Sequence, residues 1–222
     1  MMKKSFMKRV VRIAACALLF GTAAIAAKAE TFNVLLDTSR LSGSAYLDLQ
    51  FNPGANDTPS ASAVLSGFSG TLNGAAEVFG ELRGSLPGTV VFINSMSYND
   101  LFQPVRLGGL FSFRLDFDGD FLADGFDAGS VFAVSLYGAD QTTPLGNADP
   151  LTGALLSINL MPASMAGPGG IAVDINDPML VLVSSAPMPV PEPASLLLIL
   201  AGGAAVAVAT GRRRGKSVDP RH

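Results

Sequence analysis

The densest group of side chains that could bind a ligand is a run of aspartates in the second half of the chain. Its members are Asp116, Asp118, Asp120, Asp124 and Asp127. Alternating aspartates place several carboxylate oxygens on one side of a turn, and a hard cation such as calcium prefers oxygen ligands. The spacing therefore indicates a candidate calcium site, and calcium is the one cofactor that we consider.

This run departs from the helix-flanked calcium loops whose ligand spacing it partly shares. Such a loop needs glycine directly after its third ligand, but Gly119 comes before the third aspartate and Phe121 stands after it. No amphipathic helix is predicted on either side. The alternative is an acidic hairpin loop in which Asp and Gly residues form turns and solvate the surface.

The usual catalytic side chains are missing from residues 30–190, which we call the body of the chain. Cys16 is the only cysteine and precedes the body, His222 is the only histidine and ends the chain, and the body has no lysine. A hydrolase would have to use two carboxylates, as glycosidases do. Glu77 and Glu81 are the only glutamates well inside the body, and alternation places them on an exposed strand face as readily as in a pocket. We therefore expect no enzymatic activity.

The charge of the body narrows the class of ligand. It contains four arginines against 16 aspartates and glutamates, a formal charge of −12. Binding to nucleic acid depends on clustered Lys and Arg that displace counterions from phosphates, and this body has no such cluster. We expect no nucleic acid partner, and cations or neutral polymers are the better candidates.

Apolar and polar residues alternate with a period of two along most of the body, which predicts strands with one buried face. Ten strands are expected, at residues 32–37, 45–51, 61–68, 78–83, 89–94, 111–117, 131–137, 155–160, 171–175 and 180–183. Turn-forming residues such as Asn52-Pro53-Gly54 separate them. No amphipathic helix of ten residues emerges. The predicted fold is all-β, a jelly-roll-like β-sandwich over residues 30–185, with a closed barrel as the competing architecture.

The N-terminus has the features of a secretory signal peptide over residues 1–29. Residues 1–12 include five basic residues, and residues 13–27 are almost wholly apolar. Ala27 and Ala29 supply the small residues of a cleavage site. The apolar run of about 15 residues is shorter than the roughly 20 that a membrane span prefers. We expect cleavage before Glu30.

The C-terminus combines three features in a fixed order. Residues 186–193 form a proline-rich, extended linker that ends in Pro191, Glu192 and Pro193. Residues 194–210 lack charge and could form a single transmembrane helix, and the basic tail at residues 211–222 opens with a cluster that would hold that end in the cytoplasm. That stop-transfer cluster is Arg212, Arg213 and Arg214. A permanent tail anchor is the simpler alternative.

This order of motif, apolar span and basic cluster resembles the PEP-CTERM sorting domain, which exosortase processes in Gram-negative bacteria that export exopolysaccharide. The resemblance implies export by the secretion machinery, transient anchoring in the inner membrane, removal of the tail near residues 191–193, and delivery to the cell surface or the extracellular matrix. Exosortase would then be a partner, with Glu192 the recognised polar residue.

The body also resembles a small group of uncharacterised PEP-CTERM proteins. The similar segments are residues 32–39, 47–54, 132–137 and 142–145. This likeness implies a shared β-rich domain and no known activity. We expect a structural or adhesive protein in exopolysaccharide, with a carbohydrate-binding module or a calcium-binding surface domain as alternatives. Sugar-binding platforms favour exposed Trp and Tyr, whereas this body has no Trp and its phenylalanines mostly stand at core positions.

Overall fold

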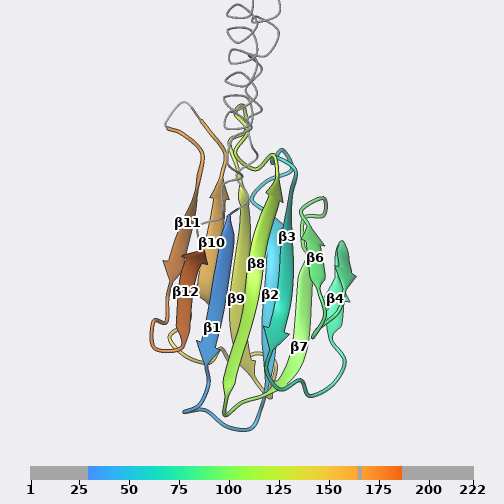
Figure 1. Cartoon of the computed structure of the whole chain (residues 1–222), viewed down its shortest axis with the longest axis vertical. Coiled ribbons are helices and arrows are strands. Elements are labelled where there is room, and N and C mark those ends of the chain that lie inside the picture. Colours follow the sequence, from blue (N-terminus) through green and yellow to red (C-terminus); the bar gives the residue numbers. More distant parts are fainter. Residues whose placement is uncertain (1–29, 165–166, 187–222) are drawn as a thin grey trace, which may run out of the picture. The chain divides into compact units, whose positions relative to one another are not determined.

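The computed structural model describes residues 30–164 and 167–186, and these residues form two antiparallel sheets of six strands each (Figure 1). Sheet A has the order β12-β1-β8-β3-β6-β5, and sheet B has the order β11-β10-β9-β2-β7-β4. The strands of sheet A are β1 (Thr31–Asp37), β3 (Ala61–Ser69), β5 (Leu82–Gly84), β6 (Val90–Ile93), β8 (Leu110–Gly119) and β12 (Val181–Ala186). Those of sheet B are β2 (Ser44–Pro53), β4 (Glu77–Phe79), β7 (Asp100–Arg106), β9 (Ser130–Gly138), β10 (Ala154–Met161) and β11 (Gly170–Ile175).

One apolar core lies between the sheets, and alternation along each strand supplies it. On β8 the core residues Phe111, Phe113, Leu115 and Phe117 alternate with outward polar residues, as the period of two requires. Rings from both sheets meet in the core: Phe117 of β8 and Phe132 of β9 lie 6.3 Å apart between ring centroids. The expected all-β architecture with two packed sheets is therefore confirmed in its coarse form.

One of the predicted strands was wrong in detail. The single strand expected at residues 78–83 is two short strands, β4 and β5, which belong to different sheets. Gly80 separates them at φ 82, and a side chain at Gly80 would meet the carbonyl oxygen of Tyr98 and the side chain of Asn99. The chain therefore crosses from sheet B to sheet A at a position that only glycine fits.

Strand β7 was not predicted at all, although it lies between β2 and β4 in sheet B. Its pattern is broken because Leu101 and Phe102 are adjacent and because Pro104 cannot donate a ladder hydrogen bond. Gln103 faces inward, is buried, and donates to the carbonyl oxygens of Gly74 and Pro104. From the sequence alone, a polar residue such as Gln103 is predicted to be exposed, because its bonds to the backbone cannot be seen there.

The two ends of the described sandwich lie side by side. Thr31 at the start of β1 pairs with Ala186 at the end of β12. The predicted signal peptide, transmembrane helix and basic tail, at residues 1–29, 194–210 and 211–222, lie outside the described residues. Within residues 30–164 and 167–186, no helix is long and apolar enough to cross a membrane.

Candidate functional site

The outward surface of sheet B gathers most of the described aromatic residues that lie outside the core. Nine phenylalanines of the described chain are buried in the core. The outward side chains of β2, β4, β7, β9 and the turn before β7 instead include five rings, which we call the aromatic face: Tyr46, Phe79, Tyr98, Phe102 and Tyr137. All three tyrosines of the chain therefore belong to one surface.

Ring contacts connect the members of the aromatic face across strands. Tyr46 and Phe102 are stacked, with centroids 4.8 Å apart and an angle of 12° between their planes. Phe102 also approaches Tyr137, at 6.1 Å, and Phe79 approaches Tyr98, at 6.5 Å. The first three rings are half-buried, whereas Phe79 and Tyr98 are about half exposed, at 52% and 47%. The face thus offers a ring surface that is both ordered and open to solvent.

Two aspartates lie buried within this surface. Asp48 on β2 pairs in register with Phe102 of β7 and with Ser135 of β9, and Asp100 pairs with Gln50, so the two aspartates are diagonal neighbours. Asp48 is only 3% exposed and Asp100 only 5%. Asp48 lies in register with Phe102, whose ring approaches that of Tyr137 across β2, so the buried aspartate is flanked by these rings.

Each aspartate has one oxygen with a donor and one without. Gln50 Nε2 donates to Asp48 Oδ2 at 2.8 Å, and the Tyr98 hydroxyl donates to Asp100 Oδ2 at 3.0 Å. Both Oδ1 atoms are buried and have no hydrogen-bond donor. Burial raises the pKa of Asp48 to about 8, and hydrogen bonding to Asp100 and the charge of Asp100 add to the rise. Asp48 therefore carries a proton at neutral pH.

The phenol groups nearby respond to the same surroundings. Burial raises the pKa of Tyr137, and the charge of Asp48 raises it further. Burial also raises the pKa of Tyr98, together with the charge of Asp100 and the hydrogen bond to it. Both hydroxyls therefore stay protonated in any physiological range and act as hydrogen-bond donors.

The loop after β9 holds one edge of the aromatic face. Gln141 Nε2 donates to the Tyr46 hydroxyl at 3.0 Å. Within the described residues, Gln141 is the one non-glycine residue with a positive φ, at 64°. Asp140 fixes the turn by accepting hydrogen bonds from the side chain of Thr143 and from the backbone of Thr143 and Thr142, and these bonds lower the pKa of Asp140 to about 2. Strained backbone of this kind concentrates at functional sites.

A polar hollow adjoins Tyr137 at the same edge. Its volume is about 410 Å³, and Thr142, Asp149 and Thr152 line it together with Gly153. A side chain at Gly153 would meet the Tyr137 hydroxyl, so this glycine leaves room for that group. Rings on one side and hydroxyl or carboxylate groups on the other are the two kinds of surface that a sugar contacts.

The predicted calcium ligands are not assembled into a site. Asp116 and Asp118 lie on the outward face of β8, and the other three aspartates lie in the loop that follows. Within the described part of the chain, no three Asp, Glu, His or Cys side chains are grouped as metal ligands would be. Calcium binding by this run stays a prediction.

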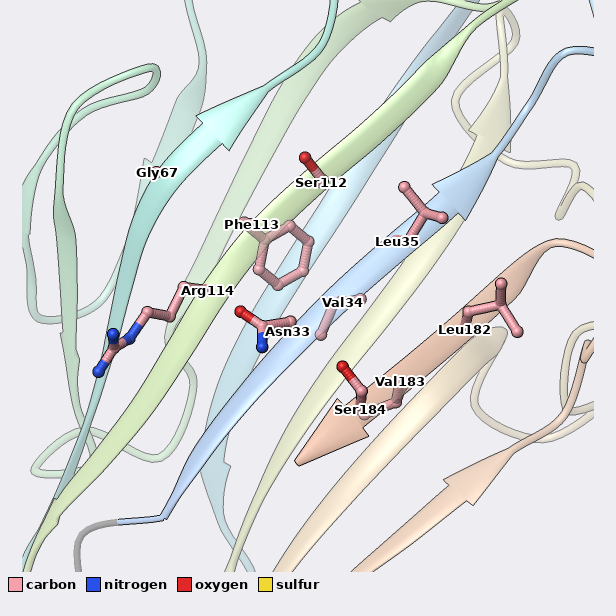
Figure 2. A pocket seen from close by; sticks show the side chains of 10 residues that line it. All are labelled: Asn33, Val34, Leu35, Gly67, Ser112, Phe113, Arg114, Leu182, Val183 and Ser184. Atoms are coloured by element: carbon pink, nitrogen blue, oxygen red, sulfur yellow. The ribbon is translucent and has the colours of Figure 1, made fainter. Parts of the chain in front are cut away.

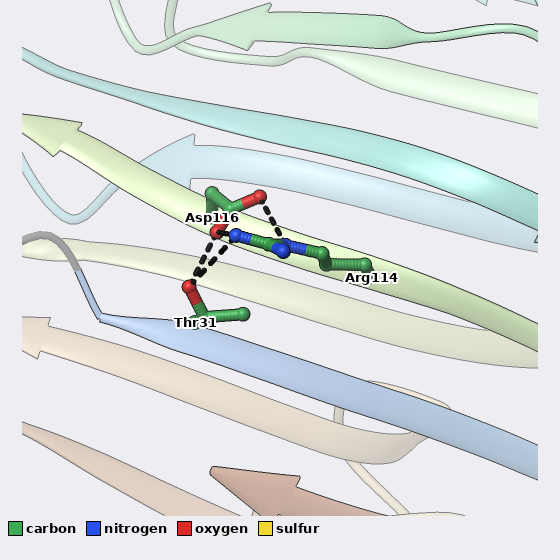
Figure 3. A network of polar contacts seen from close by, with 3 residues as sticks. All are labelled: Thr31, Arg114 and Asp116. Carbon is green, nitrogen blue, oxygen red and sulfur yellow. Dashed lines mark hydrogen bonds and ion pairs between the residues drawn. The ribbon is translucent and has the colours of Figure 1, made fainter. Parts of the chain in front are cut away.

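Asp116 has partners of its own on sheet A (Figure 3). Arg114 donates to both of its carboxylate oxygens, at 2.8 Å from Nη2 and 2.9 Å from Nε, and Thr31 donates as well. Partial burial alone would raise the pKa of Asp116, but these bonds and the arginine charge outweigh it and lower the pKa. This carboxylate is therefore already satisfied within the protein.

The remaining predicted residues fall in two groups. Glu77 lies on edge strand β4, and Glu81 lies in the turn after it, where it accepts hydrogen bonds from Ser95 and Arg83. The two do not form a catalytic pair in a cleft. The predicted sorting and processing residues lie outside the described residues; they are Ala27, Ala29, Pro191, Glu192, Pro193, Arg212, Arg213 and Arg214.

A shallow groove of about 640 Å³ crosses the outward face of sheet A (Figure 2). It opens where β3 bulges between Ser66 and Ser69, because Gly67 places no side chain there. Leu35 and the 61% exposed Leu182 line it, with Arg114 beside them. The one ring in its lining, Phe113, is only 3% exposed and belongs to the core, so this groove has no stacking surface.

Comparison of the chain with models of protein families, with curated proteins and with solved structures finds no match. The geometry of the described residues therefore carries the functional argument.

Sequence reasoning missed the aromatic face because Phe102, which contacts both Tyr46 and Tyr137, lies on the unpredicted strand β7. A local signal was present: Tyr98, Asp100 and Phe102 alternate, as do Tyr46 and Asp48 on β2. The pairing of β2 with β7 brings the two series together. It joins residues about 50 positions apart in the chain, so no local sequence pattern reveals it.

Proposed function

We propose that this protein is an exported surface or matrix protein whose β-sandwich binds exopolysaccharide through the aromatic face. The stack of Tyr46 on Phe102, continued by Tyr137 and by the exposed pair of Phe79 and Tyr98, carries the proposal. Aromatic faces pack against the apolar faces of sugar rings, and tyrosine hydroxyls hydrogen-bond to sugar hydroxyls. The role is structural or adhesive, with the sandwich holding the polymer.

The arrangement of strands supports a binding role on this surface. The order β1-β8-β3-β6 in sheet A and β2-β7-β4 in sheet B supports a jelly-roll-like arrangement, to which β9–β11 and β12 add strands on one side. Jelly-roll domains include lectin domains. The added strand β9 supplies Tyr137, so the extension of sheet B widens the ring surface beyond the strands of the basic fold.

The acidic character of the body favours a neutral polymer over an anionic one. Two of its four arginines, Arg83 and Arg114, are paired with carboxylates. The aromatic face itself contains Glu77 in register with Phe102, in addition to the buried aspartates. A polyuronate would be repelled by this surface, whereas a neutral polymer needs only rings and hydrogen-bond donors.

We propose a binding function without catalysis. Glycosidase carboxylates stand about 5 to 10 Å apart on either side of the scissile bond. Asp48 and Asp100 instead contact each other, and at 3% and 5% exposure they do not flank a bound substrate. They support the surface from beneath.

Delivery to the polymer would follow the PEP-CTERM route. The pairing of Thr31 with Ala186 places the start and the end of the sandwich at one end of sheet A. The inner membrane would hold the protein transiently, and exosortase would release it.

The proposal is tested by affinity electrophoresis of the exported protein in gels that contain exopolysaccharide of the native host. We expect retardation of the wild-type protein and at least partial loss of it in Phe79→Ala and Phe102→Ala. Met179→Ala is the matched control, because Met179 is 72% exposed and lies between β11 and β12, outside the aromatic face and outside the hollow beside Tyr137. Unretarded wild-type protein, or equal retardation of all variants, would contradict binding by this face.

A further inference from the structure

The two buried aspartates of sheet B have a charge that nothing else in the described protein balances. Oδ1 of Asp48 and Oδ1 of Asp100 are both buried without a donor, and the two residues are diagonal neighbours on the same face of paired strands, close enough for their carboxyl groups to share a hydrogen bond. Two carboxylates in contact cannot both be ionised without a large cost, because like charges at this distance and depth repel strongly. Something positive must lie between them.

The groups that face the pair do not include a cation. Tyr46 of β2, Tyr137 of β9, Glu77 of β4 and Tyr98 before β7 are the other titratable groups directed to this surface. Arg106 of β7 is exposed and is in register with Ser44, which lies four residues before Asp48 on β2. A metal ion would require more ligands than two carboxylates, and no third metal-ligating side chain is grouped with them in the described chain. A proton needs only the two oxygens.

We infer that Asp48 and Asp100 share one proton between their Oδ1 atoms and that this proton holds the aromatic face together, so that polysaccharide binding weakens when the proton is lost at alkaline pH. The inference rests on the proposed function for its binding part. The shared proton gives both unpartnered oxygens a hydrogen bond.

A chain of hydrogen bonds transmits this arrangement along β2. Asn52 Nδ2 donates to Gln50 Oε1 at 3.0 Å, and Gln50 in turn donates to Asp48. At the other side Tyr98 donates to Asp100. Loss of the proton leaves a second negative charge beside the contact between Phe102 and Tyr137, and apart from the Gln50 bond to Oδ2 only water can stabilise that charge. Water reaches Asp48 when those two rings separate.

The structure offers a variant that keeps the hydrogen bonds without the proton. In Asp48→Asn the amide nitrogen donates to Asp100 as the shared proton does, and the amide oxygen accepts from Gln50. Asp127→Asn is the matched control, since it makes the same substitution at an exposed aspartate outside the pair. Asp100→Asn is a second variant with the same logic from the other strand.

Two measurements on the exported protein test the inference. Carbon-13 NMR of the aspartate carboxyl groups should reveal one group that titrates near pH 8 in wild type and in Asp127→Asn and is absent in Asp48→Asn. Affinity electrophoresis in native exopolysaccharide should show binding about tenfold weaker at about pH 9 than at about pH 6, since the protonated fraction falls about tenfold over the unit above the pKa. Asp48→Asn should bind equally at both pH values.

Each outcome bears on one part of the inference. If every aspartate carboxyl titrates below about pH 5, there is no shared proton. If the carboxyl titrates as expected but wild type and Asp48→Asn lose binding together, the proton does not control the face. If no variant binds at either pH, the proposed function fails, and the NMR titration alone decides whether the proton is shared.

Discussion

Replacement of Asp48 by asparagine should change how the stability of the protein depends on pH. The pKa of Asp48 is raised to about 8 in the folded protein, against about 3.9 for an aspartate in an unfolded chain. Between these values the folded protein keeps a proton that the unfolded chain releases. The free energy of unfolding of wild type therefore falls as the pH rises through this window and levels off above about pH 8.

The size of the effect follows from the same two values. Each pH unit inside the window changes the free energy of unfolding by about 1.4 kcal/mol, so the loss between about pH 5 and about pH 8 reaches an upper limit of about 4 kcal/mol. A domain of this size has a total stability of about 5 to 15 kcal/mol, so the change is easily measured. Asp48→Asn should be more stable than wild type at about pH 8, because asparagine carries no charge to bury.

Urea denaturation at several pH values between about pH 5 and about pH 8 measures this slope. Other groups with shifted pKa values do not interfere in that range. The pKa values of Asp140, Asp149 and Asp116 are lowered, so their stabilising contribution is lost only as the pH falls below about 4. A wild-type stability that stays level across the window, or a slope that Asp48→Asn shares with Asp127→Asn, would refute the reasoning.

Three further predictions concern the core, the turn before β7 and the loop beside Tyr46. Phe132→Ala should lower the free energy of unfolding by about 3 to 5 kcal/mol, measured by urea denaturation, because Phe132 is fully buried; a loss below about 1 kcal/mol would contradict this packing. Asn99→Ala should cost about 3 kcal/mol in the same assay, because its buried side chain bonds to three backbone groups of surrounding segments; an unchanged midpoint would show that water replaces those bonds. Gln141→Gly should leave stability within about 1 kcal/mol, since relief of the positive φ offsets the greater freedom of the unfolded chain. The same change should weaken polysaccharide retardation through loss of the bond to Tyr46, and unaltered retardation would exclude a role for this loop.

The strands that could be predicted from the sequence are those whose inward residues are all apolar. Strand β8 is the clearest, because Phe111, Phe113, Leu115 and Phe117 alternate without interruption. Strand β7 escaped prediction because one inward position holds Gln103, which is buried by its bonds to backbone carbonyls. The bond to Gly74 reaches the loop before β4, and it leaves no trace in the alternation of apolar and polar residues along β7.

The candidate site was less predictable than the fold. Alternation places Asp48 on the outward side of β2, where an aspartate is ordinarily exposed. It is buried because Phe102 and Tyr137 reach across from the neighbouring strands, and this depends on the order β9-β2-β7. The aspartates at residues 116–127 are close together in sequence, yet Asp116 bonds to Thr31 and Arg114 on its own sheet A, away from the other aspartates of the run.

The proposed sugar-binding face has a built-in reporter, because the chain contains no Trp and its three tyrosines, Tyr46, Tyr98 and Tyr137, all belong to that face. Tyrosine fluorescence of the exported protein, titrated with exopolysaccharide of the native host, therefore tests the central claim most directly. Binding at the aromatic face predicts a saturable change in tyrosine emission that is reduced in Phe102→Ala and kept in Met179→Ala. Retardation in the polysaccharide gel without any change in tyrosine emission would place the polymer on another surface and contradict the account.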